Sequence, residues 1–255
     1  MKTIRFFARV FLCLLFASSV FSAAFAEEPA EIKTIPEGAV VLFAGTSTEL
    51  FADKLGNATD WQIVDRSLVS TAKDTRSNHA VSKLHFRDAH IHVEFNMDEA
   101  SHGNSGIYIH GHYEVQIYDS RGKDVPDVQD MGALYGIHAP LVHAGKAPGE
   151  WQTFEIRYVA PRRDSDGKIV KKGRVSVWLN GQQVLDNVEF EEPVSQYHPY
   201  RYRATPYLQT IEKRLLATSI GPVFLQDHDS PCRFRNIWIK PLDSKAFFYE
   251  TDKED

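Results

Sequence analysis

The chain has 255 residues, of which 43% are hydrophobic, 12% aromatic and 25% charged, and its net charge at pH 7 is −5. This length suits one large domain with a hydrophobic core of its own. The acidic balance argues against a nucleic-acid partner, because a nucleic-acid-binding surface needs an excess of Lys and Arg.

The first 26 residues are typical of a secretory signal peptide. Three basic side chains fall within residues 1–9, an apolar run with only two serines covers 11–20, and 24–26 read Ala-Phe-Ala, as at a cleavage site. The apolar run is short for a membrane-spanning helix, which needs about 20 residues. We therefore expect cleavage after Ala26, a periplasmic or secreted protein, and no membrane span in the mature chain.

The mature chain is predicted to begin with a linker over 27–39 and to end with a polar tail over 243–255. Between them, over 40–242, short apolar runs alternate with turn signals. Most runs alternate with period two, as strands do, and helical periodicity is absent apart from one short turn near 211–216. The pattern predicts an all-β sandwich or jelly roll.

The residues 103–109 and 113–119 predict two short adjacent strands. Because side chains alternate along a strand, Glu114, Gln116 and Tyr118 share one face of the second strand, and the apolar residues between them face the core. A carboxylate, an amide and a phenol in a row are unusual on a purely structural strand. Glu114 is the leading candidate for a general base, a role that requires a pKa raised by partial burial.

A further strand over 90–95 places His90, His92 and Glu94 on one face. Side chains at alternate positions could bind a divalent metal, which leaves a metal cofactor open. Alternatively, Glu94 is a second carboxylate in the ligand groove. A pair formed by Glu94 and Glu114 would also suit ordinary glycoside hydrolysis.

Other side chains could contact a sugar. Arg233 and Arg235 project from one face of the last strand and could hold hydroxyls or an oxyanion, or else form ion pairs with a neighbouring strand. Trp178 and Asn180 could stack on and hydrogen-bond a sugar, although Trp178 could equally cover the sheet edge. The remaining candidates lie in loops or near strand ends: Asn104, Tyr135, His138, Gln226 and His228.

Together these motifs resemble the family of bacterial 3-keto-disaccharide hydrolase domains. The most specific are Asn-Ser-Gly-Ile at 104–107 and Tyr-Glu-Val-Gln-Ile-Tyr-Asp at 113–119. The others follow the family order at 41–45, 61–65, 91–95, 132–135, 149–152, 177–181, 221–228 and 234–239. The chain departs from the family pattern at Gln152 and Asp229, and it also has a longer region at 182–220 and Cys232 in place of a typical Val. The last two are expected near the rim of the site, where they would affect specificity more than fold.

The resemblance implies a concanavalin-like β-sandwich of two antiparallel sheets with a ligand groove on the concave face. It also implies an enzyme that acts on 3-keto-glycosides. Glu114 or a histidine such as His138 would remove the C2 proton, and Arg235, His228 or a metal would stabilise the enolate. The C1 leaving group would then depart by β-elimination, and water could add back.

Two alternatives use the same residues. A non-catalytic, lectin-like carbohydrate-binding module would need the same groove and aromatic side chains. A conventional glucanase would use Glu94 and Glu114, although the lectin-like glucanases carry a denser acidic signature than the strand at 113–119. In every case we expect a carbohydrate ligand, and the sequence identifies no protein partner.

Overall fold

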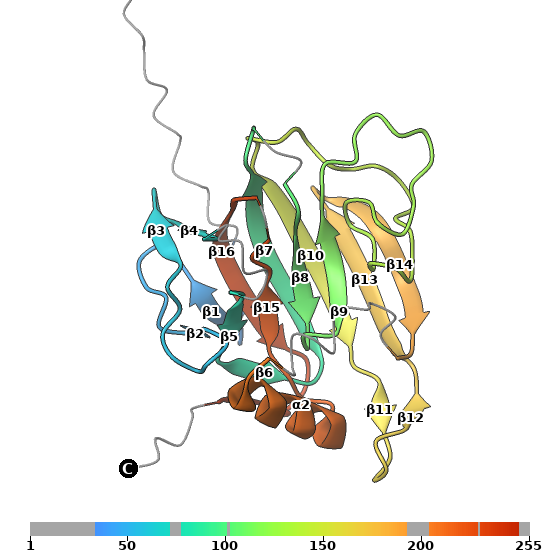
Figure 1. Cartoon of the computed structure of the whole chain (residues 1–255). Helices are drawn as coiled ribbons and strands as arrows, with labels where there is room; N and C mark the ends of the chain where they lie inside the picture. The colour runs from blue at the N-terminus through green and yellow to red at the C-terminus, as the bar shows by residue number, and fades with distance from the viewer. Residues whose placement is uncertain (1–33, 72–77, 101–102, 193–203, 229, 250–255) are drawn as a thin grey trace, which may run out of the picture. The chain divides into compact units, whose positions relative to one another are not determined.

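The computed structural model describes residues 34–71, 78–100, 103–192, 204–228 and 230–249, which belong to one unit of the chain. Strands dominate this part of the chain (Figure 1). The expected signal peptide and most of the expected linker lie outside the described residues.

The larger sheet has eight strands, and every pairing in it is antiparallel. The strands are β1 (Val40–Phe43), β3 (Gln62–Val64), β4 (Ser67–Val69), β7 (Ala89–Met97), β10 (Gln152–Val159), β13 (Gly173–Leu179), β14 (Gln182–Phe190) and β16 (Cys232–Pro241). Their order is β14-β13-β10-β7-β16-β4-β3, and β1 also pairs with β16.

The smaller sheet has five antiparallel strands in the order β2-β5-β15-β8-β9. They are β2 (Phe51–Ala52), β5 (Ala80–Ser82), β8 (Ser105–Ile109), β9 (Tyr113–Ile117) and β15 (Val223–Leu225). Two short ribbons join β11 (Arg162–Arg163) to β12 (Ile169–Lys171), and β6 (Leu84–Phe86) to β17 (Ala246–Phe248).

One hydrophobic core lies between the two sheets. Val93 and Phe95 of β7 belong to the same buried cluster as Val115 and Ile117 of β9, and in Figure 1 the smaller sheet lies in front of the larger one. The predicted all-β sandwich of two antiparallel sheets is therefore confirmed. The inward side chains also show that Glu114, between Val115 and Tyr113 in sequence, projects from the outer face of the smaller sheet.

Helix α2 (Pro206–Thr218) is longer than the single turn expected from the sequence. Thr205 caps its N-terminus by accepting a hydrogen bond from the Leu208 amide at 3.2 Å, and Pro206 begins the first turn, where its missing N–H costs nothing. Ser219, with φ of 56°, ends the helix in the left-handed region.

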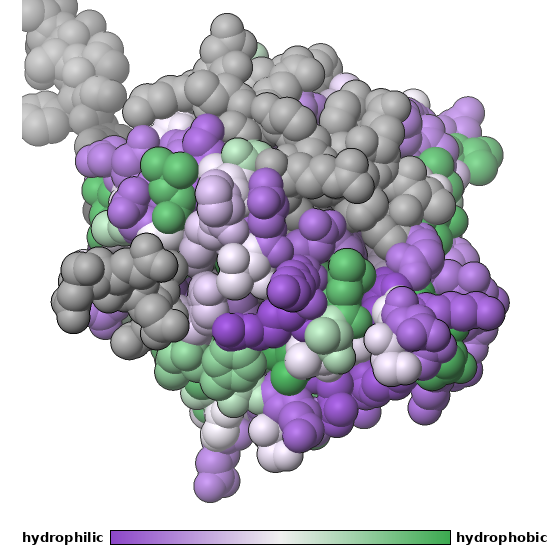
Figure 2. Space-filling model, turned by 60° about the horizontal axis from the view of Figure 1, so that its bottom comes forward, coloured by the Kyte–Doolittle hydropathy of each residue, from purple (hydrophilic) through white to green (hydrophobic). Residues whose placement is uncertain are grey.

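Three apolar residues of α2 pack on the outer face of the smaller sheet. Leu208, Ile211 and Leu215 form a second buried cluster, in which Tyr108 and Phe224 come from the sheet. The rest of the helix mixes polar residues with apolar ones such as Leu216, which is partly exposed. The described residues on the face shown in Figure 2 are also mixed, with hydrophilic side chains the more frequent. No helix among the described residues is long and apolar enough to cross a membrane.

Part of the expected C-terminal tail is ordered. Residues 246–248 form β17, and the Tyr249 amide donates to the Lys83 carbonyl at 2.8 Å. Phe247 and Tyr249 pack beside the ring of His85, with centroids 5.6 and 5.0 Å away. The sequence prediction missed this strand because its partner, β6, lies far away in the chain.

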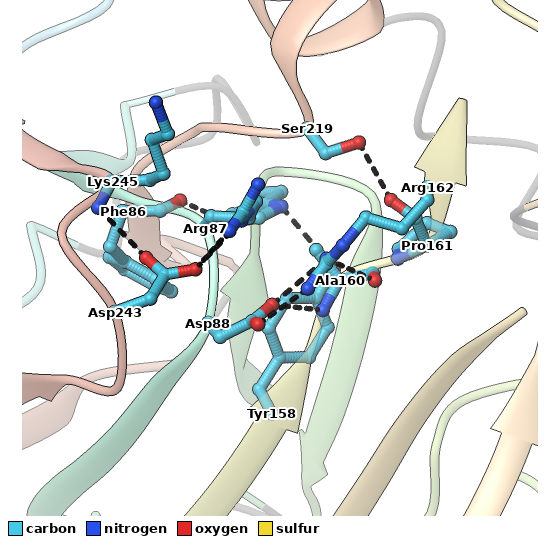
Figure 3. A network of polar contacts seen from close by, with 11 residues as sticks. Phe86, Arg87, Asp88, Tyr158, Ala160, Pro161, Arg162, Ser219, Asp243 and Lys245 are labelled. Carbon is cyan, nitrogen blue, oxygen red and sulfur yellow. Dashed lines mark hydrogen bonds and ion pairs between the residues drawn. The ribbon is translucent and has the colours of Figure 1, made fainter. Parts of the chain in front are cut away.

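A polar network fixes the end of the sandwich below β7 and β10 (Figure 3). Asp88 accepts hydrogen bonds from the Arg162 guanidinium and from the Ala160 amide at 2.9 Å. His110 Nε2 lies 2.8 Å from the Phe86 carbonyl, which can only accept, so Nε2 carries the hydrogen and Tyr158 donates to Nδ1 at 3.3 Å. Burial lowers the pKa of His110 to about 3, which keeps this arrangement neutral.

Candidate functional site

Glu114 lies in a hydrogen-bonded chain across the outer face of the smaller sheet. It faces Tyr108 in the β8–β9 register, and the Tyr108 hydroxyl donates to Glu114 Oε2. Gln226, just after β15, donates from Nε2 to the Tyr108 oxygen at 3.2 Å. An amide, a phenol and a carboxylate are thus aligned, and all three residues are buried.

Gly106 makes room for the Glu114 carboxylate. A Cβ atom at residue 106 would lie 2.4 Å from Glu114 Oε1 and 2.8 Å from its Cγ, well inside contact distance. The glycine in the Asn-Ser-Gly-Ile motif therefore has a steric reason, because the carboxylate lies over its backbone.

The segment at 104–106 is tied to residues 226–228. The Gln226 amide donates to the Gly106 carbonyl at 3.0 Å, and Ser105 Oγ donates to the Gln226 carbonyl at 2.9 Å. The Asn104 side-chain nitrogen lies 3.4 Å from His228 Nε2. Three predicted site residues, Asn104, Gln226 and His228, are therefore brought to the same end of strands β8 and β15.

The residues 132–135 run along the free side of β9. The Gln116 amide donates to the Ala133 carbonyl at 3.1 Å, and the Tyr135 amide donates to the Glu114 carbonyl at 2.9 Å. Gln116 Nε2 reaches the Gln129 carbonyl at 3.2 Å, and Gln129 Nε2 lies 3.5 Å from the Tyr135 hydroxyl. This pairing brings Gln116 and Tyr135 into the neighbourhood of Glu114.

Two other predicted residues lie nearby in the chain. Tyr118 is half-buried and follows β9 directly. His138 pairs through its backbone with Leu134, and its Nε2 donates to the Glu189 carbonyl of β14 at 2.8 Å. This bond gives the His138 ring a structural role at the edge of the larger sheet.

Glu94 and Arg235 are not brought to Glu114. They face each other across β7 and β16, and Arg235 Nε donates to Glu94 Oε2 at 2.8 Å. Val93 and Phe95, on either side of Glu94, point into the core, so Glu94 projects from the outer face of the larger sheet. The apolar core separates the two carboxylates, so within the described part of the chain they do not line one common groove, contrary to our prediction.

The His-x-His-x-Glu pattern forms a hydrogen-bond network instead of a metal site. Glu155 of β10 is bound by His90 Nε2 and by His92 Nδ1, both at 2.8 Å. His92 Nε2 lies 3.8 Å from Glu94 Oε1, and Asn236 donates to the same oxygen at 2.9 Å. Within the described ranges, no three His, Cys, Asp or Glu side chains are grouped so that they could hold a metal ion.

This network shifts the pKa values of its members. Burial alone would raise the pKa of Glu94, but hydrogen bonds from His92 and its other donors outweigh burial and lower it to about 2. The same balance, with His90 and His92 as donors, lowers the pKa of Glu155 to about 2. Burial would lower the pKa of His92, yet its bonds to the two carboxylates raise it. Trp238 lies flat beside His92, with ring centroids 5.0 Å apart.

The remaining candidates also belong to the larger sheet or its turns. Arg233 forms an ion pair with Asp65 at 3.0 Å. Trp178 is half-buried and faces Glu155 across β13 and β10, away from the core. Asn180 is in the β13–β14 turn, with φ of 53°, and its Oδ1 accepts from the Thr153 amide at 3.0 Å. These contacts give Arg233 and Asn180 structural functions.

Sequence reasoning missed Tyr108 and the steric role of Gly106. The signal was present, because the two strands were predicted to be adjacent. Pairing Ile109 with Tyr113 around the turn at 110–112 places Tyr108 opposite Glu114. Once this register is written out, both missed residues lie on the same face as the predicted base.

Residues 38–240 match the 3-keto-alpha-glucoside-1,2-lyase-like domain. A solved structure from Parabacteroides distasonis ATCC 8503, provisionally named a glycosyl hydrolase, is 28% identical, with 81% of this chain and 85% of that chain covered and a TM-score of 0.67. A second structure from that organism, with the same provisional name, is 23% identical, covers 81% and 95%, has a TM-score of 0.54 and supports the fold alone.

Comparison with curated proteins gives no significant match. The family match, however, spans both sheets, the Tyr108–Glu114 pair and the segment around His228. This chain belongs to the 3-keto-alpha-glucoside-1,2-lyase-like domain family.

Proposed function

We propose that the chain is an exported enzyme that cleaves 3-keto-glycosides by proton abstraction at C2 and elimination at C1. The family match and the glycosyl-hydrolase name of the similar structure support a carbohydrate-active enzyme. The observation that carries the proposal is the buried Glu114 carboxylate, bound by Tyr108 on the outer face of the smaller sheet. This placement suits a general base.

The C3 ketone of such a substrate makes the C2 hydrogen acidic, so one positioned carboxylate can remove it. Glu114 takes that proton, the electrons move toward the ketone oxygen, and the C1–O bond then breaks. Water addition to the resulting enone would give net hydrolysis. His228, which lies by Asn104 at the same end of the sheet, is our candidate donor to the enolate or leaving oxygen.

A two-carboxylate mechanism does not fit the geometry. Retaining and inverting glycosidases place two carboxyl groups across one bond, about 5 to 9.5 Å apart. Glu94 and Glu114 instead project from opposite outer faces of the sandwich, with the core between them. The glucanase alternative therefore loses the pair of residues on which it depended.

The direct test compares a 3-keto-disaccharide with its unoxidised parent, using mature protein that starts at residue 27, with and without EDTA. We expect monosaccharide release from the keto sugar alone, since only its C2 hydrogen is acidic. Equal release from the parent would contradict the elimination mechanism. Saturable binding without release from either sugar would favour the carbohydrate-binding module, and loss of release in EDTA would reveal a metal requirement.

Gly106→Ala should impair this reaction. The added methyl group would meet Glu114 Oε1 at 2.4 Å and displace the carboxylate from Tyr108. A displacement of about 1 Å can cost about 10²-fold in rate, so we expect kcat/KM to fall by roughly that factor. Gly145→Ala is the matched control, because its Cβ would make ordinary contact with Met131 at 3.4 Å. If Gly106→Ala and Gly145→Ala both fold and have equal kcat/KM, the steric role of Gly106 is refuted.

The export part of this proposal has its own test. Expression of the full chain in a bacterium with a periplasm should yield a processed protein beginning at Glu27, because 24–26 read Ala-Phe-Ala. N-terminal sequencing of the periplasmic fraction checks the site. An uncleaved chain that stays in the cytoplasm would contradict it.

A further inference from the structure

We propose that Tyr108 is a positioning residue that keeps Glu114 ionised and fixes its orientation for proton transfer. The inference rests on the proposed role of Glu114 as the base, and it concerns a residue that the sequence did not single out. Tyr108 and Glu114 are exposed by only 1% and 6%, so their hydrogen bond is shielded from solvent.

The direction of this hydrogen bond follows from Gln226. The Gln226 Nε2 group can only donate, and it donates to the Tyr108 oxygen at 3.2 Å. The phenol hydrogen is therefore directed toward Glu114 Oε2. A donor aimed at a carboxylate stabilises its charged form more than its neutral form.

Burial acts on Glu114 in the opposite direction. Removing a carboxylate from water favours protonation, and a protonated carboxyl group cannot serve as a base. The Tyr108 hydroxyl opposes this effect, because its hydrogen bond stabilises the charged carboxylate that a base requires. The hydroxyl also holds Oε2 in place while Oε1 lies over Gly106.

The Tyr108 ring is itself held by hydrophobic packing. It belongs to the buried cluster with Phe224 and with Leu208, Ile211 and Leu215 of α2, and the ring of His79 stacks on it at 6.3 Å. Tyr108→Phe keeps these contacts and removes only the hydroxyl. The substitution therefore separates the electrostatic role of Tyr108 from its packing role.

The test is a carboxyl ¹³C NMR titration of mature protein labelled at Glu, with the Glu114 signal assigned by its loss in Glu114→Gln. In Tyr108→Phe we expect the pKa of Glu114 to rise by about one unit or more, because a donor to a charged group has been removed. The acid limb of the kcat/KM profile on the 3-keto-disaccharide should move by the same amount. Tyr158→Phe removes another buried phenol, which bonds to His110, and should leave both quantities unchanged.

An unchanged pKa of Glu114 in Tyr108→Phe would overturn the inference, even if the enzyme cleaves keto sugars. A shifted pKa in a protein that releases nothing would uphold the coupling and refute the proposed function. If Tyr108→Phe does not fold, Gln226→Met tests the same chain, because it removes the amide that directs the phenol hydrogen. A raised pKa of Glu114 in that variant supports the inference, and an unaltered one contradicts it.

Discussion

Replacing Glu114 by Gln should abolish most turnover on a 3-keto-disaccharide while sugar binding persists. The amide has nearly the shape of the carboxylate but cannot accept a proton from C2. General bases typically contribute about 10² to 10⁴ in rate, so we expect kcat to fall by that factor. Steady-state kinetics together with calorimetric binding of the unoxidised parent would measure the two effects separately.

Glu94→Gln is the matched control for this experiment. It removes the other carboxylate that the sequence predicted for the site, but from the outer face of the larger sheet. We expect lower stability and an unchanged kcat for this variant, because Glu94 binds Arg235 and Asn236 and projects from the opposite face of the sandwich to Glu114. A large loss of kcat in Glu94→Gln, comparable to that in Glu114→Gln, would instead support a conventional glucanase that uses both carboxylates.

The network on the larger sheet should give the folded protein a pH optimum of stability. In the folded protein, Glu94 and Glu155 each have a pKa of about 2, compared with the ordinary value of 4.5. Their contribution to the free energy of unfolding is therefore complete above pH 4.5 and disappears toward pH 2. The pKa of His92 is raised above 6.5, so its contribution is complete below 6.5 and is lost as the pH rises through the folded value. The network therefore stabilises the protein most between these limits.

Urea unfolding from pH 2.5 to pH 8 would measure this dependence. The two carboxylates share His92, so together they are expected to contribute on the order of 3 kcal/mol to the acid limb. The double variant Glu94→Gln, Glu155→Gln should flatten that limb. Glu189→Gln should not, because the Glu189 side chain is 46% exposed and its ion pair with Arg174 lies at the surface. An unaltered acid limb in the double variant would show that other carboxylates control acid unfolding.

The sequence correctly predicted which side chains share one face of a strand, because this depends only on the local pattern of residues. Alternation along 113–117 correctly separated Glu114 and Gln116 from the apolar residues that face the core. The same reasoning placed His90, His92 and Glu94 on one face of β7, which the structure confirms. In both strands the period-two pattern was sufficient, because the apolar core residues lie on only one side of each strand.

The sequence did not predict which strands, far apart in the chain, belong to the same sheet. Alternation cannot show that β7 and β16 pair with each other in the larger sheet while β8 and β9 belong to the smaller one. Arg235 was therefore grouped with Glu114 in the mechanism, although the alternative prediction, an ion pair with a neighbouring strand, is the one that the structure confirms, with Glu94 as the partner. Helix α2 was underestimated for a related reason: its buried side has only three residues, and their apolar contact with Tyr108 and Phe224 is tertiary.

The central claim is that cleavage begins with removal of the C2 proton, and the fate of that hydrogen tests it most directly. We would incubate the mature enzyme briefly with a 3-keto-disaccharide deuterated at C2 and analyse the released sugar by mass spectrometry, correcting for exchange without enzyme. Loss of deuterium from C2 in each product molecule, absent in Glu114→Gln, is the result we predict. Release of a product that retains its C2 deuterium would contradict the mechanism.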